Sequence, residues 1–180
     1  IRRRGEKGIN GAGKAPREGG VIVQKIIIGS DKSGFSLKEA VKAHLLERGV
    51  EVEDCGTLSL EAGIPYFEVA PVVAERVQSG EFSRGILICG TGAGMAVVAN
   101  KYRGVYAVAC ESVYAAEKCR AINDANVMTM GGWIVAPELG VAMVDKFLDT
   151  GFTDNLEEWR RDFLKNARVK VANLEETIYK

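Results

Sequence analysis

Histidine is almost absent from this chain, and its cysteines form no paired motif. The 180 residues include one histidine, His44, and four cysteines, none of them in a Cys-x-x-Cys pair. Because zinc sites are built mainly from closely spaced cysteines and histidines, we expect no metal site. Hydrolysis by a nucleophile with a histidine partner is also disfavoured, since His44 falls inside a predicted helix.

Long apolar runs and an excess of one charge are absent as well. No apolar run approaches the roughly 20 residues of a membrane span. The 24 basic and 24 acidic residues cancel, so we expect no nucleic-acid partner. Residues 1–24 are basic and rich in glycine, and we expect them to be a disordered tail or leader. We expect the chain to be soluble and cytoplasmic, with no membrane partner.

From residue 25 onward, short apolar runs alternate with segments of helical periodicity. This alternation predicts a parallel sheet covered on both faces, a doubly wound α/β/α domain over residues 25–150. A second helix opens at Pro65 and contains Pro71, which predicts a kink or a later start. The five strand-like runs are KIIIGSD (25–31), VEVEDCG (50–56), RGILICG (84–90), GVYAVAC (104–110) and ANVMTMGG (125–132).

The last segment, residues 151–180, departs from this alternation. Apolar residues recur there at spacings of three and four between Leu156 and Ile178, which predicts one long amphipathic helix. Asn155 or Asp154 is the candidate N-cap. A helix of about 20 residues is near 30 Å long and exceeds the edge of so small a domain. It could pack on its own sheet or on a second copy of the chain, and we favour the second copy.

The candidate site follows the third predicted strand. The sequence CGTGAG, residues 89–94, places alternate glycines between a buried strand and a helix. In open α/β sheets ligands bind outside the carboxyl ends of the strands, and the amides of such a turn suit an anion or oxyanion. The glycines could also serve only to make the turn. A dinucleotide fingerprint or a phosphate-binding P-loop does not match the spacing.

Cys89 lies where the strand meets the helix, a position that favours the thiolate. The remaining cysteines are expected to be small apolar fillers: Cys55, Cys110 and Cys119. Without a histidine beside Cys89, removal of a proton next to a carbonyl fits the sequence better than nucleophilic attack.

Three segments of the sequence resemble the ribose-5-phosphate isomerase B family, which includes the galactose-6-phosphate isomerase subunits. They are residues 29–59, 86–108 and 123–132, with the string CGTGAGMAVVANK as the most specific part. The resemblance implies a Rossmann-like homodimer, or a dimer of dimers, with its active site at the subunit interface. It also implies interconversion of an aldose and a ketose phosphate of the ribose-5-phosphate type through a cis-enediolate, without metal or cofactor.

The resemblance further implies roles for individual residues. Cys89 matches the base that moves a proton between C1 and C2, and Asp31 matches a group that handles a sugar hydroxyl. Thr91 belongs to the catalytic loop, whose amides hold the enediolate oxygens. The residues expected to bind substrate are Lys32, Gly90, Gly92, Gly94, Asn123 and Arg168.

Three positions depart from the pattern of the family. Lys32 and Ile122 stand where the family has histidines, the second of which opens the sugar ring, and Leu164 stands where it has another phosphate-binding arginine, with Lys165 the nearest cation. Three outcomes follow. The substrate could be an open-chain sugar such as a tetrulose phosphate, another acid such as Asp124 or Glu111 could open the ring, or the protein could bind a sugar phosphate without turnover.

Overall fold

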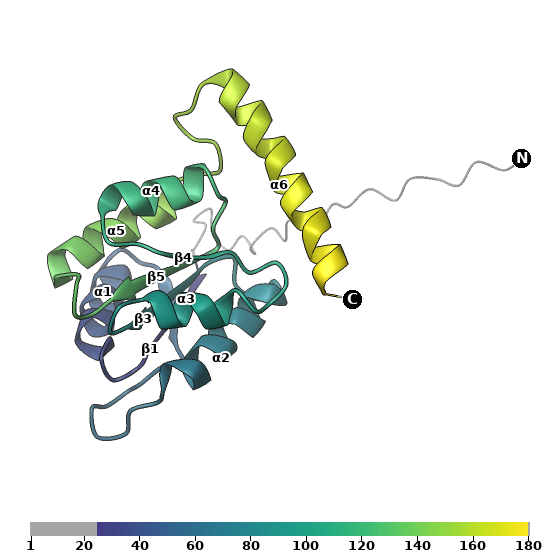
Figure 1. Cartoon of the computed structure of the whole chain (residues 1–180). Coiled ribbons are helices and arrows are strands. Elements are labelled where there is room, and N and C mark those ends of the chain that lie inside the picture. Colours follow the sequence, from purple (N-terminus) through teal and green to yellow (C-terminus); the bar gives the residue numbers. More distant parts are fainter. Residues whose placement is uncertain (1–24, 180) are drawn as a thin grey trace, which may run out of the picture.

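Residues 25–179 are described by a computed structural model, in which strands and helices alternate along the chain (Figure 1). The strands are β1 (Lys25–Ser30), β2 (Glu51–Asp54), β3 (Gly85–Cys89), β4 (Ala107–Ala109) and β5 (Val127–Gly131). They form one parallel sheet in the order β2-β1-β3-β5-β4. The predicted five-stranded sheet is therefore confirmed, whereas the expectation for residues 1–24 lies outside the described residues.

Helices cover both faces of the sheet, which confirms the α/β/α prediction. One face is covered by α1 (Phe35–Glu47), α4 (Val113–Ala121) and α5 (Pro137–Asp149), and the other by α2 (Tyr66–Gln78) and α3 (Ala93–Ala99) (Figure 1). Pro65 precedes α2 as its N-cap, and Pro71 lies inside the helix.

The apolar residues of the strands explain these layers. Ile26 and Ile28 of β1 pack with the first group of helices and Ile27 with the second, and all three side chains are fully buried. Strands buried on both faces require such continuous apolar runs. Because β1, β3 and β5 are parallel neighbours, their carboxyl ends lie side by side at one end of the sheet. Asp31 and Cys89 both lie at that end.

The long C-terminal helix is present and begins later than the sequence predicts. It is α6 (Glu158–Ile178), and Figure 1 shows it set off from the three layers. The predicted N-cap at Asn155 or Asp154 is wrong. Asn155 has a φ of 55°, a left-handed conformation that belongs to the preceding turn, and the Asp154 carboxylate accepts a hydrogen bond from the Gly151 amide at 2.6 Å. Glu157 is the N-cap instead.

The apolar stripe of α6 is largely exposed in the single chain. Leu164 is the one buried residue of this helix, while Trp159, Phe163 and Ile178 are 65–71% exposed. A contiguous apolar surface of this kind is typical of a contact with another molecule. Within residues 25–179, no helix is both long and apolar enough to cross a membrane.

Candidate active site

Cys89 is held at the end of β3 with a hydrogen-bond donor aimed at its sulfur. Its side chain is buried, and the backbone N–H of Gly92 donates to Sγ at 3.2 Å. Gly92 has a φ of 79°, a conformation that glycine adopts without strain. The Thr129 hydroxyl of β5 donates to the Gly92 carbonyl at 2.8 Å and fixes this turn. The sulfur of Cys89 thus has a fixed polar partner at the point where β3 meets α3.

Asp31 and Lys32 lie beside this loop, at the same end of the sheet. The Asp31 amide donates to the carbonyl of Ile88, the residue before Cys89, at 3.2 Å. The Asp31 carboxylate accepts from the Gly34 amide at 3.0 Å, which orients the side chain. Asp31 and Lys32 line a cavity of about 480 Å³, whose other lining residues are Ser33, Glu61, Gly63, Ile64, Pro65 and Tyr66.

Asn123 and Arg168 lie at the opposite end of the sheet. Asn123 comes just before β5 begins, whereas Cys89 is paired with Gly131, where β5 ends. The length of this strand separates the two levels by roughly 15 Å. Asn123 and Arg168 line a second cavity of about 540 Å³ together with Ile122 and Leu164. A single chain therefore does not bring all of the predicted site residues together.

The guanidinium of Arg168 is tied to the loop that carries Asn123. Its Nε lies 2.5 Å from one oxygen of Asp124, and the other oxygen accepts a hydrogen bond from the buried Arg120 at 2.9 Å. Both oxygens of Asp124 are thus paired with guanidinium groups, which gives no support to Asp124 as a proton donor for ring opening. Glu111, the other acid considered, is exposed after β4.

Further contacts fasten the C-terminal part of α6 over this cavity. The Glu175 carboxylate accepts hydrogen bonds from the Gly104 amide at 3.1 Å and from the Tyr106 hydroxyl at 3.2 Å. These polar contacts place Arg168, two helical turns earlier, above the second cavity. The apolar stripe of α6 is left free at the same time.

Sequence reasoning missed two residues near the first cavity. Tyr66 lines this cavity from the start of α2, and no sequence pattern assigned a role to it because an aromatic residue at a helix start is usually a packing residue. Lys38 of α1 is fully buried, although lysine is normally exposed. Asp54, an acidic residue on the predicted neighbouring strand, was the available signal for a buried cation.

No three His, Cys, Asp or Glu side chains of residues 25–179 lie close enough together to hold a metal ion. The neighbouring carboxyl ends of β1 and β3 offer a thiol, amide donors, a carboxylate and a lysine. This set of groups can move protons between adjacent carbon and oxygen atoms, which is the chemistry of an aldose–ketose isomerase.

Comparison with known proteins also indicates an aldose–ketose isomerase. The sequence profile described as Ribose/Galactose Isomerase matches residues 26–163. A 4-deoxy-4-sulfo-D-erythrose isomerase from Clostridium sp. (strain MSTE9) is 65% identical over 156 residues, covering 87% of this chain and 98% of the relative. A D-erythrulose-4-phosphate isomerase from Mycolicibacterium smegmatis is 41% identical, covering 71% of this chain and 86% of the relative.

The solved structures agree with this classification. Ribose-5-phosphate isomerase B from Clostridium thermocellum superposes with a TM-score of 0.77 at 37% identity, covering 86% of this chain and 99% of the other. The protein is an isomerase of the sugar-phosphate isomerase class. The chain belongs to the ribose/galactose isomerase family, which confirms the resemblance found in the sequence.

Proposed function

We propose that this protein interconverts an open-chain aldose and ketose of four carbons that carry an anionic group at C4, with 4-deoxy-4-sulfo-D-erythrose as the preferred aldose. The observation that carries this proposal is Ile122, which stands at the position of the ring-opening histidine of the family. The 65% identity to an isomerase named for that sugar supports the same substrate.

The chemistry of the sugar explains why a histidine is not needed. A four-carbon aldose closes a five-membered ring only through its C4 hydroxyl. In a 4-deoxy-4-sulfo sugar a sulfonate replaces that hydroxyl, and in a 4-phosphate the oxygen is esterified. Neither sugar forms the ring, so no residue has to open it. An isoleucine, which cannot transfer a proton, is therefore tolerated at position 122.

Cys89 acts in this proposal as the base, without metal or cofactor. Its thiolate removes the proton from C2 of the aldose and later delivers it to C1, while the proton of the C2 hydroxyl is transferred to O1. The enediolate formed between these steps carries its negative charge on oxygen. The loop amides of residues 90–94 other than that of Gly92, which donates to Cys89, stabilise that charge, as preorganised backbone donors do in other enzymes. Asp31 is placed to handle a sugar hydroxyl, and Lys32 adds a positive charge at the same cavity.

The site is completed, we propose, by a second copy of the chain. Asn123 and Arg168 of one copy then face Cys89 of the other. This arrangement explains why the predicted site residues lie at opposite ends of the sheet within a single chain. The exposed stripe of α6 supports this arrangement, because a twofold dimer would bury it. The segment of residues 151–180 serves in this proposal as the dimer contact, and residues 25–150 form the α/β/α domain.

The composition of the second cavity favours a sulfonate. Arg168 shares its charge with Asp124, and the position one helical turn earlier is the apolar Leu164. A sulfonate carries a single negative charge, whereas a phosphate monoester carries about −1.5 to −2 at neutral pH. One partly neutralised guanidinium thus matches the sulfonate better than the phosphate.

Proton NMR in D₂O tests the proposal. The purified protein is incubated in turn with 4-deoxy-4-sulfo-D-erythrose, erythrose 4-phosphate and ribose 5-phosphate. We expect conversion to the ketose with deuterium at C1 or C2, fastest for the sulfonated tetrose and slowest for ribose 5-phosphate. Isomerisation of ribose 5-phosphate at the highest rate would show that the ring is opened and would refute the open-chain proposal.

A further inference from the structure

Tyr66 joins the cavity of Asp31 and Lys32 to the glycine loop. Its side chain lines that cavity from the first turn of α2 and is 39% exposed. On its other side the ring lies against Gly94, where an added Cβ would be 3.0 Å from ring atom Cε2. Gly94 is therefore a glycine partly because the ring of Tyr66 occupies the space of a side chain. A molecule that reaches from Asp31 to the loop passes this ring.

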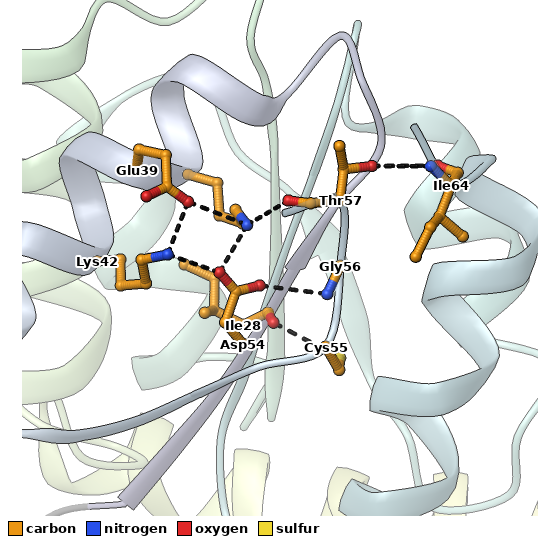
Figure 2. Close-up of polar contacts among 9 residues, drawn as sticks. Ile28, Glu39, Lys42, Asp54, Cys55, Gly56, Thr57 and Ile64 are labelled. Atoms are coloured by element: carbon orange, nitrogen blue, oxygen red, sulfur yellow. Dashed lines mark hydrogen bonds and ion pairs between the residues drawn. The ribbon is translucent and has the colours of Figure 1, made fainter. Parts of the chain in front are cut away.

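The segment before Tyr66 has no regular secondary structure and is fixed by hydrogen bonds. The Thr57 amide donates to the Ser30 carbonyl at 2.8 Å, which ties the segment to the end of β1. The Thr57 hydroxyl accepts from the Ile64 amide at 3.0 Å, and this contact closes the loop two residues before Tyr66 (Figure 2). The position of Thr57 thus sets the position of Tyr66.

Thr57 is itself held from the other side by Lys38. The Nζ of Lys38 donates to the Thr57 carbonyl at 2.6 Å and to the Asp54 carboxylate at 2.6 Å, and it lies 3.1 Å from Glu39. This lysine is fully buried, and a buried charge is tolerated only where it is paired and hydrogen-bonded. The chain of contacts runs from Lys38 through Thr57 and Ile64 to Tyr66.

Lys42, one helical turn later, is a natural comparison. Its Nζ contacts the same two carboxylates, Asp54 at 2.8 Å and Glu39 at 2.7 Å (Figure 2). Its hydrogen bonds end at these carboxylates, whereas those of Lys38 continue to the Thr57 carbonyl. The two lysines therefore share a charge environment and differ in their link to the site.

We propose that Tyr66 contacts the substrate through its phenolic O–H, and that Lys38 is the positioning residue that holds Tyr66 in place. This proposal rests on the proposed function, because it adds Tyr66 to the same site. A phenol beside Asp31 donates a hydrogen bond to a sugar oxygen, and its ring forms an apolar wall beside the carbon chain.

The first test compares Tyr66→Phe with Tyr66→Ala, using 4-deoxy-4-sulfo-D-erythrose as the probe and Tyr114→Phe on exposed α4 as the control. We expect Tyr66→Phe, which keeps the ring contact with Gly94, to lower kcat/KM and to weaken calorimetric binding by roughly three- to tenfold. Tyr66→Ala should lower kcat/KM and weaken binding further, and Tyr114→Phe should have the kcat/KM and Kd of the wild type. Unchanged kcat/KM and Kd in both Tyr66 variants would overturn the proposal.

The second test compares Lys38→Met with Lys42→Met. We expect Lys38→Met to raise KM or Kd several-fold more than Lys42→Met does. We also expect Tyr66→Phe to lower kcat/KM less in a protein that already carries Lys38→Met than it does in the wild type. Equal effects of the two lysine variants would overturn the positioning role. If Lys38→Met does not fold, the double variant Thr57→Val with Tyr66→Phe replaces it, since Thr57→Val breaks the contact with Ile64. If the losses of kcat/KM from Thr57→Val and from Tyr66→Phe simply add in the double variant, the proposal is contradicted.

The two proposals fail in different ways. Turnover by the wild type with no loss in the Tyr66 variants would refute the role of Tyr66 alone. Binding of the sugar without turnover would refute the proposed function, and the Kd of Tyr66→Phe would still decide the role of Tyr66. A wild-type protein that binds none of the sugars would refute both.

Discussion

The amide of Gly92 donates a hydrogen bond of 3.2 Å to the sulfur of Cys89. The donor belongs to the residue that caps α3 and the acceptor to the residue that ends β3, so one tight turn makes the contact. A backbone donor cannot rotate away as a side chain can. The contact therefore keeps a hydrogen-bond donor aimed at the sulfur of the proposed base.

Replacement of Cys89 by serine should abolish proton transfer and leave the fold intact. A hydroxyl at this position is too weak a base, and general-base catalysis typically contributes about 10²- to 10⁴-fold to the rate. We expect kcat to fall by about that factor with little change in the melting temperature. Deuterium exchange at the wild-type rate in Cys89→Ser would mean that another group is the base.

Leu164→Arg should shift the preference between anionic groups. Leu164 lines the second cavity one turn before Arg168, so an arginine there adds a second guanidinium to the same wall. A charge-assisted hydrogen bond contributes about 1.5–3 kcal/mol, and a dianion gains more from it than a monoanion. We expect kcat/KM for erythrose 4-phosphate to rise about tenfold relative to the sulfonated tetrose.

Leu164→Met is the matched control, because Leu164 is the buried residue of α6 and its replacement alone can loosen the helix. This variant should leave the ratio of the two substrates as it is in the wild type. An unchanged ratio in a folded Leu164→Arg protein would mean that the anion is bound elsewhere.

Stability should fall in acid through Asp54. Burial alone would raise the pKa of this carboxyl, but hydrogen bonds from Lys38 and Lys42 outweigh it and lower the pKa below its usual value. Because the folded-state pKa is the lower one, Asp54 stabilises the protein fully above the unfolded pKa of about 3.9 and loses this effect as the pH falls through the folded value. Urea unfolding between pH 6 and pH 2 measures the slope.

Asp54→Asn should flatten that slope and also lower stability at neutral pH, by roughly 3 kcal/mol, because Lys38 loses its main counter-charge. Glu47→Gln removes an exposed carboxylate outside the network and should keep the wild-type profile. An Asp54→Asn protein with the wild-type slope would show that other carboxylates, such as Glu39, govern the acid transition.

The fold could be predicted almost completely from the sequence, because its evidence is local. Strands of a parallel sheet that are buried on both faces must be apolar runs, as in β1 and β3, and Gly90 marks the end of β3. The predicted N-cap of α6, Asn155 or Asp154, is wrong, since a polar residue before an apolar stripe looks the same whether it caps the helix or lies in the turn before it.

The positions of the candidate site residues in the fold could be predicted only in part, because they depend on distant contacts. Cys89 and Asp31 follow neighbouring strands, and a sequence pattern places both at one end of the sheet. Asn123 precedes β5, so it lies at the other end of the sheet from Cys89. Tyr66 and Lys38 could not be found from the sequence, because their contacts depend on the loop between β2 and α2, whose path follows no periodic pattern.

Complementation between two inactive variants tests whether two copies of the chain share one site. Cys89→Ser and Arg168→Met are co-expressed in equal amounts with different tags. If the site combines Cys89 of one copy with Arg168 of the other, each mixed twofold dimer holds one intact site, and the mixture regains about a quarter of the wild-type activity. A mixture no more active than the separate variants would contradict a site shared between two copies.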